Sequence, residues 1–550
     1  MQRQDLLSRR TLQALFLVFC ITWFGTLDYR KLVKADEGRY AEIAREMAAS
    51  GDWLTPRLNG LKYFEKPPLQ YWATAAAFTA FGEREWTARL WPAATGFLCV
   101  LLLFHTGRRL FGSRAGLLAA AVAASSFLFL TMGHFNALDM GLAFFLQLSV
   151  SGFLLAQKAR TPAAARNCML LAWAGLALAV LSKGIVAPLL TGAALLAYSL
   201  LARDASPWRR LHPGSGLPLF LLIAAPWFIA VSLANPEFPD FFFIHEHVER
   251  FLTRVHGRYQ PWWYFLPVLA AGALPWTLIM VQAAAGAWRR TTIEAFQPKR
   301  FLLVWATLVF AFFSASGSKL PSYILPMLPA LALLAGELLA RMGRRALSLH
   351  LAAILLLAAV ALGLLARATG LAATDPAAEP LSRYALWLSL AIGGWFAGTL
   401  AALWLVRHER LLPAMLTLAA AAHLAGLGAL LGHEQLGRSN SAHYIAGQVA
   451  PLLKEGVPFY SVRMYEQTLP FYLRRTVTLV DYRDEMGFGL DQEPEKGLAT
   501  IEAFRQRWQA DDDAFAVMHR NTYEQFARDG LSMRVVAEDA RQLIVRKARP

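Results

Sequence analysis

Apolar runs close to 20 residues long recur along the first 430 or so residues of the chain, with short polar segments between them. That is about the length an α-helix needs to cross the ~30 Å hydrocarbon core of a bilayer. We therefore predict a polytopic α-helical membrane protein with about thirteen spanning helices. Their approximate cores are 11–27, 90–107, 115–132, 137–156, 167–182, 185–202, 217–233, 264–284, 301–315, 322–340, 348–366, 384–406 and 411–431.

The pattern changes near residue 433. Short runs rich in β-branched and aromatic residues now alternate with amphipathic stretches, which is typical of strands alternating with helices. We predict strands at 458–462, 476–481, 514–518 and 533–538, and helices at 501–509 and 522–529. The predicted organisation is a membrane domain, 1–432, which includes the polar loops 28–89 and 234–262, followed by an α/β domain, 433–550.

Charge gives the predicted helices an orientation. The chain carries a net charge of +16, yet residues 433–550 hold 16 Lys/Arg against 17 Asp/Glu, so the excess belongs to the membrane part. Alternate loops are short and basic, and the positive-inside rule places them in the cytoplasm. They are 107–114, 157–166, 202–210, 288–300, 341–345 and 406–410, together with the N-terminus. An odd number of spans then puts loop 28–89 and the C-terminal domain outside, and nucleic acid is excluded as the reason for the basic balance.

Acidic residues lie at this outer boundary in two segments of the chain. "KADEGRYAEIAREM" (34–47) opens with Asp36 and Glu37 and continues as an amphipathic helix. "GHFNALDMGLAFF" (133–145) places Asp139 at the outer edge of a predicted span. Either residue of the first pair fits a helix cap. An acid at a membrane edge is costly unless it is paired or functional, so Asp36 and Asp139 converging on one substrate stays the competing interpretation.

Cations gather at the same predicted level. One alone is typical of a side chain that reaches the lipid headgroups, but six on the less basic side favour a phosphate-rich ligand held by charge-assisted hydrogen bonds. The six are Arg39, Lys66, Lys183, Arg250, Arg254 and Lys319. Glu65, His245 and His247 offer ligands to a divalent metal, although a helix would direct the two histidines to different faces. The chain contains no Gly-rich phosphate loop, GxSxG or HExxH motif.

Four segments together resemble the bacterial GT-C membrane glycosyltransferases of the protein-mannosyltransferase-like superfamily. They are "DEGRYAEIAREM", "GDWLTPRLNGLKYFEKPPLQYW", "HFNALDMG" and "HEHVERF". The chain is most similar to the members that transfer 4-amino-4-deoxy-L-arabinose to lipid A. The loop that carries the acid pair and "YFEKPPLQYW" is shared with relatives that act on other sugars.

The resemblance implies an inverting transfer from a sugar on undecaprenyl phosphate to a phosphate of lipid A. It places the chain in the bacterial inner membrane, surrounded by membrane lipids, with the active site and the C-terminal α/β domain in the periplasm, and we expect a monomer. Asp36 and Asp139 match the acids of the family, and Glu65 and His245 match the place of a metal that some members need. The positions expected around the carrier phosphate are Lys66, Lys183, Arg250 and Tyr323, with Arg39 beside Asp36.

Two other classes of function stay open at this point. A transporter or lipid flippase typically shows inverted repeats and ionisable groups near the midplane, whereas the charges here gather at one surface. A related GT-C transferase with another polyprenyl-phosphate sugar, or with a protein acceptor, shares most of the same motifs. A scaffold role leaves the outward cations unexplained.

Overall fold

The chain forms two compact units in the computed structural model, which describes residues 8–249, 260–289, 296–372 and 379–548. The helical unit comprises Met1–Leu27 and Trp91–Gly432. The mixed unit comprises Asp28–Leu90 and His433–Pro550. The sequence-based division assigned loop 28–89 to the membrane domain, whereas the structure groups this loop with the C-terminal residues. The reason is a dense set of contacts between them, described below.

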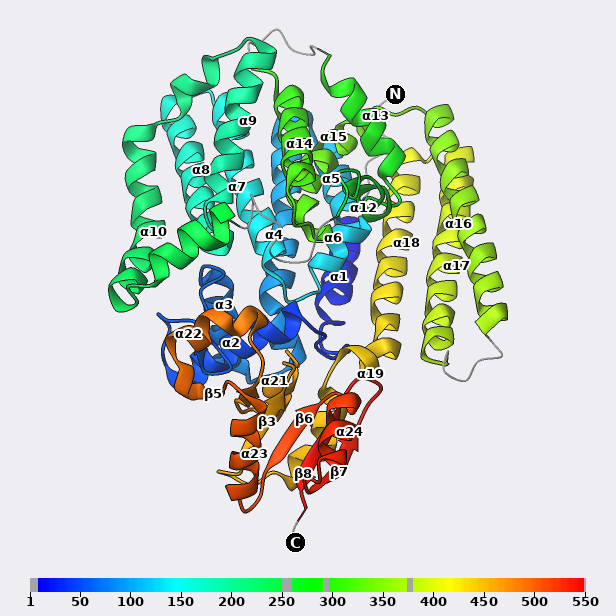
Figure 1. Ribbon diagram of the computed structural model, residues 1–550. Coiled ribbons are helices and arrows are strands. Elements are labelled where there is room, and N and C mark those ends of the chain that lie inside the picture. The colour runs from blue at the N-terminus through cyan, green and yellow to red at the C-terminus, as the bar shows by residue number, and fades with distance from the viewer. Residues whose placement is uncertain (1–7, 250–259, 290–295, 373–378, 549–550) are drawn as a thin grey trace. The chain divides into compact units, whose positions relative to one another are not determined.

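Long apolar helices make up the helical unit (Figure 1). Pairs that follow one another in the chain pack closely, as α7 does on α8 and α17 on α18. The helices are α1 (Arg9–Phe24), α4 (Glu85–Phe111, which begins in the mixed unit), α5 (Ser113–Ser125), α6 (Phe127–Met132), α7 (Leu138–Lys158), α8 (Pro162–Lys183), α9 (Val186–Ala202), α10 (Pro213–Ala234), α12 (Phe265–Gly272), α13 (Thr277–Ala287), α14 (Pro298–Ala315), α15 (Leu328–Ala340), α16 (Arg344–Ala372), α17 (Glu379–Arg407) and α18 (Leu411–Gly432). The unit also contains a π-helix, η2 (Asp240–Glu249), and two 3₁₀ helices, η1 (Ser206–Arg210) and η3 (Pro321–Met327).

The number of spans differs from the predicted thirteen. Nine helices of the described chain are long and apolar enough to cross a bilayer, or ten if the bent pair α12–α13 counts as one span. Three other predicted spans correspond to shorter apolar helices, because α1, α5 and α9 have 16, 13 and 17 residues. The prediction of a polytopic helical membrane protein is confirmed, but the count of thirteen is not.

Two of the predicted spans are broken, and their breaks meet. The segment 115–132 divides at Ser126 into α5 and α6, and 264–284 bends by 110° between α12 and α13. The backbone N–H of Phe127 donates to the carbonyl of Leu274 (3.3 Å), and the Trp276 indole donates to Ser125 Oγ (2.9 Å). Lipid offers no hydrogen-bond partner to the backbone groups that lose their helical bond at a break. Two breaks that face each other can supply hydrogen bonds to each other instead.

A six-stranded sheet organises the C-terminal part of the mixed unit, as predicted for an α/β domain. Its order is β5-β4-β3-β6-β8-β7, with β5, β4, β3 and β6 parallel and the last two strands antiparallel. The strands are β3 (Phe459–Val462), β4 (Thr478–Val480), β5 (Gly497–Leu498), β6 (Phe515–Met518), β7 (Met533–Glu538) and β8 (Leu543–Lys547). The helices include α20 (His443–Val449), α21 (Leu469–Leu473), α22 (Gly487–Gln492), α23 (Ile501–Ala510) and α24 (Arg520–Arg528). Phe504, Trp508 and Phe526 of α23 and α24 pack with Tyr460 and Val545 of the sheet to form its core.

The first loop supplies the rest of the mixed unit. It contains α2 (Asp36–Ser50), the hairpin β1 (Arg57–Leu58) and β2 (Leu61–Lys62), and α3 (Leu69–Phe81). Asn59, at the hairpin turn, pairs with both backbone groups of Val477: its amide donates to the Val477 carbonyl (2.7 Å) and its oxygen accepts from the Val477 N–H (2.8 Å). The Asn59 side chain thus makes the two hydrogen bonds that a neighbouring strand would make next to β4. These bonds join the loop to the sheet.

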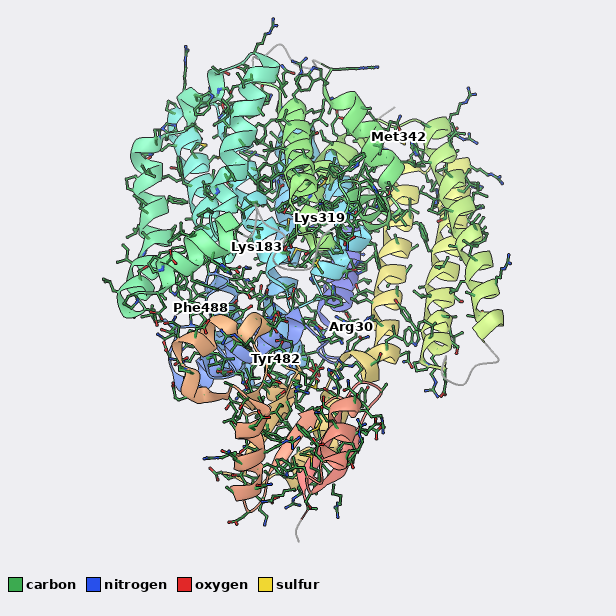
Figure 2. The ribbon with its side chains drawn as sticks, in the orientation of Figure 1. Arg30, Lys183, Lys319, Met342, Tyr482 and Phe488 are labelled. Atoms are coloured by element: carbon green, nitrogen blue, oxygen red, sulfur yellow. The ribbon has the colours of Figure 1, made fainter. Side chains whose placement is uncertain are left out.

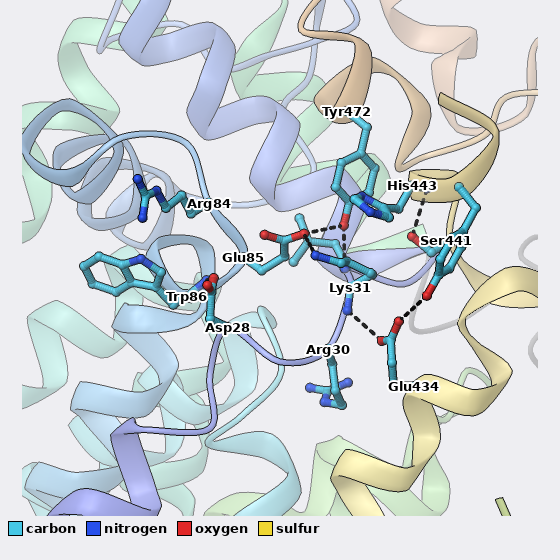
Figure 3. A network of polar contacts seen from close by, with 12 residues as sticks. Asp28, Arg30, Lys31, Arg84, Glu85, Trp86, Glu434, Ser441, His443 and Tyr472 are labelled. Atoms are coloured by element: carbon cyan, nitrogen blue, oxygen red, sulfur yellow. Dashed lines mark hydrogen bonds and ion pairs between the residues drawn. The ribbon is translucent and has the colours of Figure 1, made fainter. Parts of the chain in front are cut away.

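A polar network joins several chain segments of the same unit (Figure 3). Lys31 Nζ donates to Glu85 (3.0 Å), while the Lys31 backbone N–H donates to Glu434 (2.8 Å). Tyr472 accepts from the backbone N–H of Leu32 (2.8 Å). The segment before α2 is therefore held by residues more than 400 positions later in the chain.

Candidate functional site

The adjacent acids Asp36 and Glu37 have different surroundings. Glu37 is 2% exposed and accepts two hydrogen bonds from the Arg89 guanidinium (2.7 and 2.9 Å) and one from the backbone N–H of Val33 (3.1 Å). Asp36 is the first residue of α2, and its side chain is 34% exposed. The capping interpretation is wrong for both, because the N-cap residue is Ala35 and no side chain caps the helix. Glu37 has a structural partner, and Asp36 is the more open of the two carboxylates.

Arg39 lies one helical turn after Asp36 and joins two carboxylates. Its guanidinium pairs with Asp36 Oδ1 (3.5 Å) and with Glu485, which comes from the connection after β4. Burial alone would lower the pKa of Arg39, but the negative charge of Glu485 and other neighbouring groups outweighs it and holds this pKa well above its ordinary value. Arg39 therefore remains charged while 4% exposed. Nothing in the sequence pattern signals Glu485 as its partner.

Lys66 lies in the segment between β2 and α3, which also contains Tyr63 and Glu65. Its ammonium donates to the Glu65 carbonyl (2.7 Å) and lies 4.0 Å from the Glu65 carboxylate. Burial raises the pKa of Tyr63 well above its ordinary value, so its hydroxyl keeps its proton. That hydroxyl is buried and has no hydrogen-bond partner in the part of the chain the structure describes. Tyr63 is thus a candidate ligand donor that the sequence analysis did not single out, although it opens "YFEKPPLQYW".

In the helical unit, three predicted site residues come together. Lys183, the last residue of α8, donates to Asp139 Oδ1 (2.5 Å) in the first turn of α7. The same ammonium lies over the ring of Tyr323 in η3, 4.5 Å from its centroid. A cation between a carboxylate and an aromatic face is stabilised by both. Asp139 is 6% exposed, so Lys183 supplies the charge partner that a buried carboxylate requires.

The remaining cations differ in role or lie outside the described residues. Lys319 donates to the backbone carbonyls of Ser316 (2.5 Å) and Gln260 (2.9 Å), which joins the connection between α14 and η3 to the segment before α12. This bonding favours a structural role for Lys319, which is labelled with Lys183 in Figure 2. Arg250 and Arg254 fall within 250–259, outside the described residues.

The described residues do not assemble a metal site. Glu65 belongs to the mixed unit and His245, on η2, to the helical unit, where its ring stacks on Phe241 at 5.3 Å. Among all the residues that the structure describes, no three His, Cys, Asp or Glu side chains are grouped to hold an ion.

The predicted site residues divide between the two units. Asp36, Arg39, Glu65 and Lys66 belong to the mixed unit, whereas Asp139, Lys183, His245 and Tyr323 belong to the helical unit. Each unit thus contains one candidate aspartate and one candidate lysine: Asp36 and Lys66 in the mixed unit, and Asp139 and Lys183 in the helical unit. That Asp36 and Asp139 converge on one substrate stays a prediction.

Two family models match the chain. The model described as "Dolichyl-phosphate-mannose-protein mannosyltransferase" matches residues 8–242, and "Aminoarabinose transferase C-terminal domain" matches residues 445–547. The first match includes α2 and α7, which carry the candidate acids. The second match covers all six strands of the C-terminal sheet.

Similarity to individual proteins extends over nearly the whole chain. The undecaprenyl phosphate-alpha-4-amino-4-deoxy-L-arabinose arabinosyl transferase of Pseudomonas paraeruginosa is 33% identical over 525 residues, 93% of each chain. The protein of the same name from Pseudomonas aeruginosa strain LESB58 is 32% identical over 524 residues, again 93% of each chain. The crystal structure of ArnT from Cupriavidus metallidurans bound to undecaprenyl phosphate is 39% identical, with a TM-score of 0.93 over 98% of this chain and 99% of that one. With both its helical part and its C-terminal domain matched in this way, the chain belongs to the family of undecaprenyl phosphate-aminoarabinose arabinosyl transferases.

Proposed function

We propose that this protein transfers 4-amino-4-deoxy-L-arabinose from undecaprenyl phosphate to a phosphate group of lipid A. The observation that carries the proposal is the end-to-end similarity to an ArnT structure bound to undecaprenyl phosphate, which covers 98% of this chain. The reaction takes place on the periplasmic side of the bacterial inner membrane, where both lipids present their headgroups. The enzyme works as a monomer.

The bonds that change define what the protein must do. An oxygen of the lipid A phosphate attacks the anomeric carbon of the sugar, and the bond from that carbon to the carrier phosphate breaks. The configuration inverts, and the products are a capped lipid A phosphate and free undecaprenyl phosphate. Because the attacking phosphate is already an anion, the transfer needs no strong base. Alignment of the two lipids and stabilisation of the departing phosphate make the large contributions to the rate of transfer.

The candidate residues have roles that fit these needs. Asp36 orients the acceptor, receives any residual proton, and interacts with the positive charge that develops on the sugar ring. Lys66, Lys183 and Arg250 neutralise the carrier phosphate through charge-assisted hydrogen bonds. Asp139 holds Lys183 in place through their 2.5 Å contact, Tyr323 lies against the same ammonium, and Arg39 pairs with Asp36.

Mass spectrometry of lipid A tests both the activity and the role of Asp36. Lipid A from a strain that lacks such a transferase should gain one aminopentose on a phosphate when it produces this protein. The Asp36→Asn variant should accumulate normally and give no product. A matched control is Asp512→Asn, which changes an exposed aspartate of the C-terminal domain and should leave the product unchanged.

Unmodified lipid A, or lipid A that carries another sugar, would refute the proposed function. Product from Asp36→Asn at the wild-type level would instead remove Asp36 from the mechanism and leave the reaction standing.

A further inference from the structure

The C-terminal sheet has an edge that α/β proteins ordinarily use for ligands. After β3, the next two strands, β4 and β5, lie on one side of β3, and the following strand, β6, lies on its other side. In parallel sheets, ligands bind beyond the carboxyl ends of the strands at the point where the order reverses. Here that point lies between β3 and β6, and the segment that leaves the carboxyl end of β3 is residues 463–468.

Helix α2 of the first loop occupies this edge. Gly38 packs directly on the main chain of that segment: a Cβ at position 38 would lie 2.6 Å from the Gln467 carbonyl oxygen and 2.7 Å from its carbon. It would also lie 2.6 Å from Thr468 Cγ2. Carbon atoms in contact prefer about 3.5–4.0 Å. Since a main-chain carbonyl cannot rotate away as a side chain can, α2 fits in this position only with glycine at residue 38.

A second contact holds the same turn of the helix. Arg39, the next residue, pairs with Glu485, which leaves the carboxyl end of β4. The guanidinium of Arg39 also reaches Asp36 at 3.5 Å. Two loops from one edge of the sheet therefore fix the turn of α2 that begins with Asp36. The β1–β2 hairpin also packs closely on a glycine, because a Cβ at Gly489 of α22 would lie 2.9 Å from the Lys62 carbonyl oxygen.

We propose that Gly38 is a positioning residue of the transferase, through which the C-terminal domain sets the place of Asp36. The inference rests on the proposed function, since it gives the C-terminal domain a part in that reaction. A side chain at position 38 pushes the first turn of α2 away from residues 467 and 468 and moves the carboxylate with it. Displacing a reacting group by about 1 Å costs on the order of 100-fold in rate.

The test uses Gly38→Ala in the full-length enzyme. Alanine is the better helix former, so α2 itself gains and any loss comes from the close contact. Gly447→Ala is the matched control, because Gly447 is also helical, lies in the same unit on α20, and has open space where a Cβ would be. Gln467→Ala is a second control. It removes a side chain and leaves the main chain that Gly38 contacts.

Two quantities are measured for each variant: binding of undecaprenyl phosphate, and kcat and KM for transfer from its aminoarabinose derivative. We expect Gly38→Ala to bind the carrier like the wild type and to lose about 10- to 100-fold in kcat with KM little changed. Both controls should transfer normally. Wild-type kcat in Gly38→Ala would overturn the inference. So would loss of binding and transfer together, because Gly38 would then maintain the fold rather than place Asp36. If the wild type itself forms no product, the proposed function fails instead.

Discussion

At the scale of single residues, burial decides what three of the carboxylates of α2 can do. Glu37 is buried against Arg89, Asp36 is a third exposed, and Glu46 is half-buried with no arginine hydrogen-bonded to it. Glu46 Oε2 accepts from the backbone N–H of Gly60 (2.8 Å), while Oε1 has no partner within the described chain. Three acids on one helix are therefore a fixed ion pair, an accessible carboxylate and a group that favours its neutral form.

Glu46 makes the stability of the protein depend on pH. Burial, and after it the neighbouring Glu42 carboxylate, raises the pKa of Glu46 from 4.5 to about 8. Between these values the folded protein binds more protons than the unfolded chain, so the free energy of unfolding falls as pH rises, by up to about 1.4 kcal/mol per pH unit. Thermal unfolding in detergent from pH 5 to 9 should show this loss. It should be smaller in Glu46→Gln, whose amide is neutral throughout.

The control for this experiment is Glu502→Gln on α23, an exposed glutamate, which should follow the wild type. An identical pH dependence in wild type and Glu46→Gln would mean that Glu46 is ionised in the folded protein. The groups that face it are Glu42 and Arg45 on its own helix and Tyr465 from the segment after β3.

At the scale of elements, Arg89 joins the start of α4 to α2 and to the segment before it. Besides Glu37, its guanidinium donates to the backbone carbonyls of Arg30 (2.6 Å) and Lys31 (2.9 Å). Arg89→Met would leave a buried carboxylate and two backbone carbonyls without this donor. We expect a loss of about 3–5 kcal/mol in the free energy of unfolding, measured in detergent with denaturant.

The matched control is Arg383→Met on α17. Arg383 pairs with Glu379 (2.7 Å), but both side chains are about two-thirds exposed, and such pairs contribute about 0–1 kcal/mol. Equal losses in the two variants would contradict the assignment of Arg89 as the residue that joins these elements.

Most elements were predictable because they repeat a period over enough residues. The long spans and the strands β3, β4, β6 and β7 follow their hydrophobic patterns closely. The break at Ser126 and the bend between α12 and α13 were missed, since each depends on the other segment, 140 or more residues away. Strand β5 has only two residues, too few for a pattern, and β8 is a short apolar run between charges.

The candidate site, too, could be predicted from the sequence only where it does not depend on contacts between distant segments. Asp139 and Lys183 could be proposed from their predicted depth and Tyr323 from the resemblance to the family, and the structure brings all three together. Glu485 could not be found, because an ion pair with a residue 446 positions earlier leaves no periodic trace in the sequence. The role of Gly38 was equally invisible, since a helix pattern shows which face is apolar but not how closely another main chain approaches.

At the scale of the whole molecule, the side of the membrane on which the mixed unit lies does not depend on the exact number of spans. Three helices connect directly to this unit, and each carries basic residues at or beside its other end. Helix α1 begins with Arg9 and Arg10, α4 ends near Arg108 and Arg109, and α18 follows the basic loop 406–410. Basic ends remain in the cytoplasm. All three connections therefore predict that the mixed unit is periplasmic.

Cysteine labelling in intact spheroplasts checks this orientation with a membrane-impermeant maleimide. Ser532→Cys, exposed in the mixed unit, should react at once, whereas Ser113→Cys, exposed in the basic loop 107–114, should react only after the membrane is permeabilised. The wild type sets the background, since its own Cys20, Cys99 and Cys168 all lie in apolar helices. The opposite pattern would place Asp36 in the cytoplasm, away from any carrier lipid that presents its sugar outside, and would refute the proposed reaction along with the orientation.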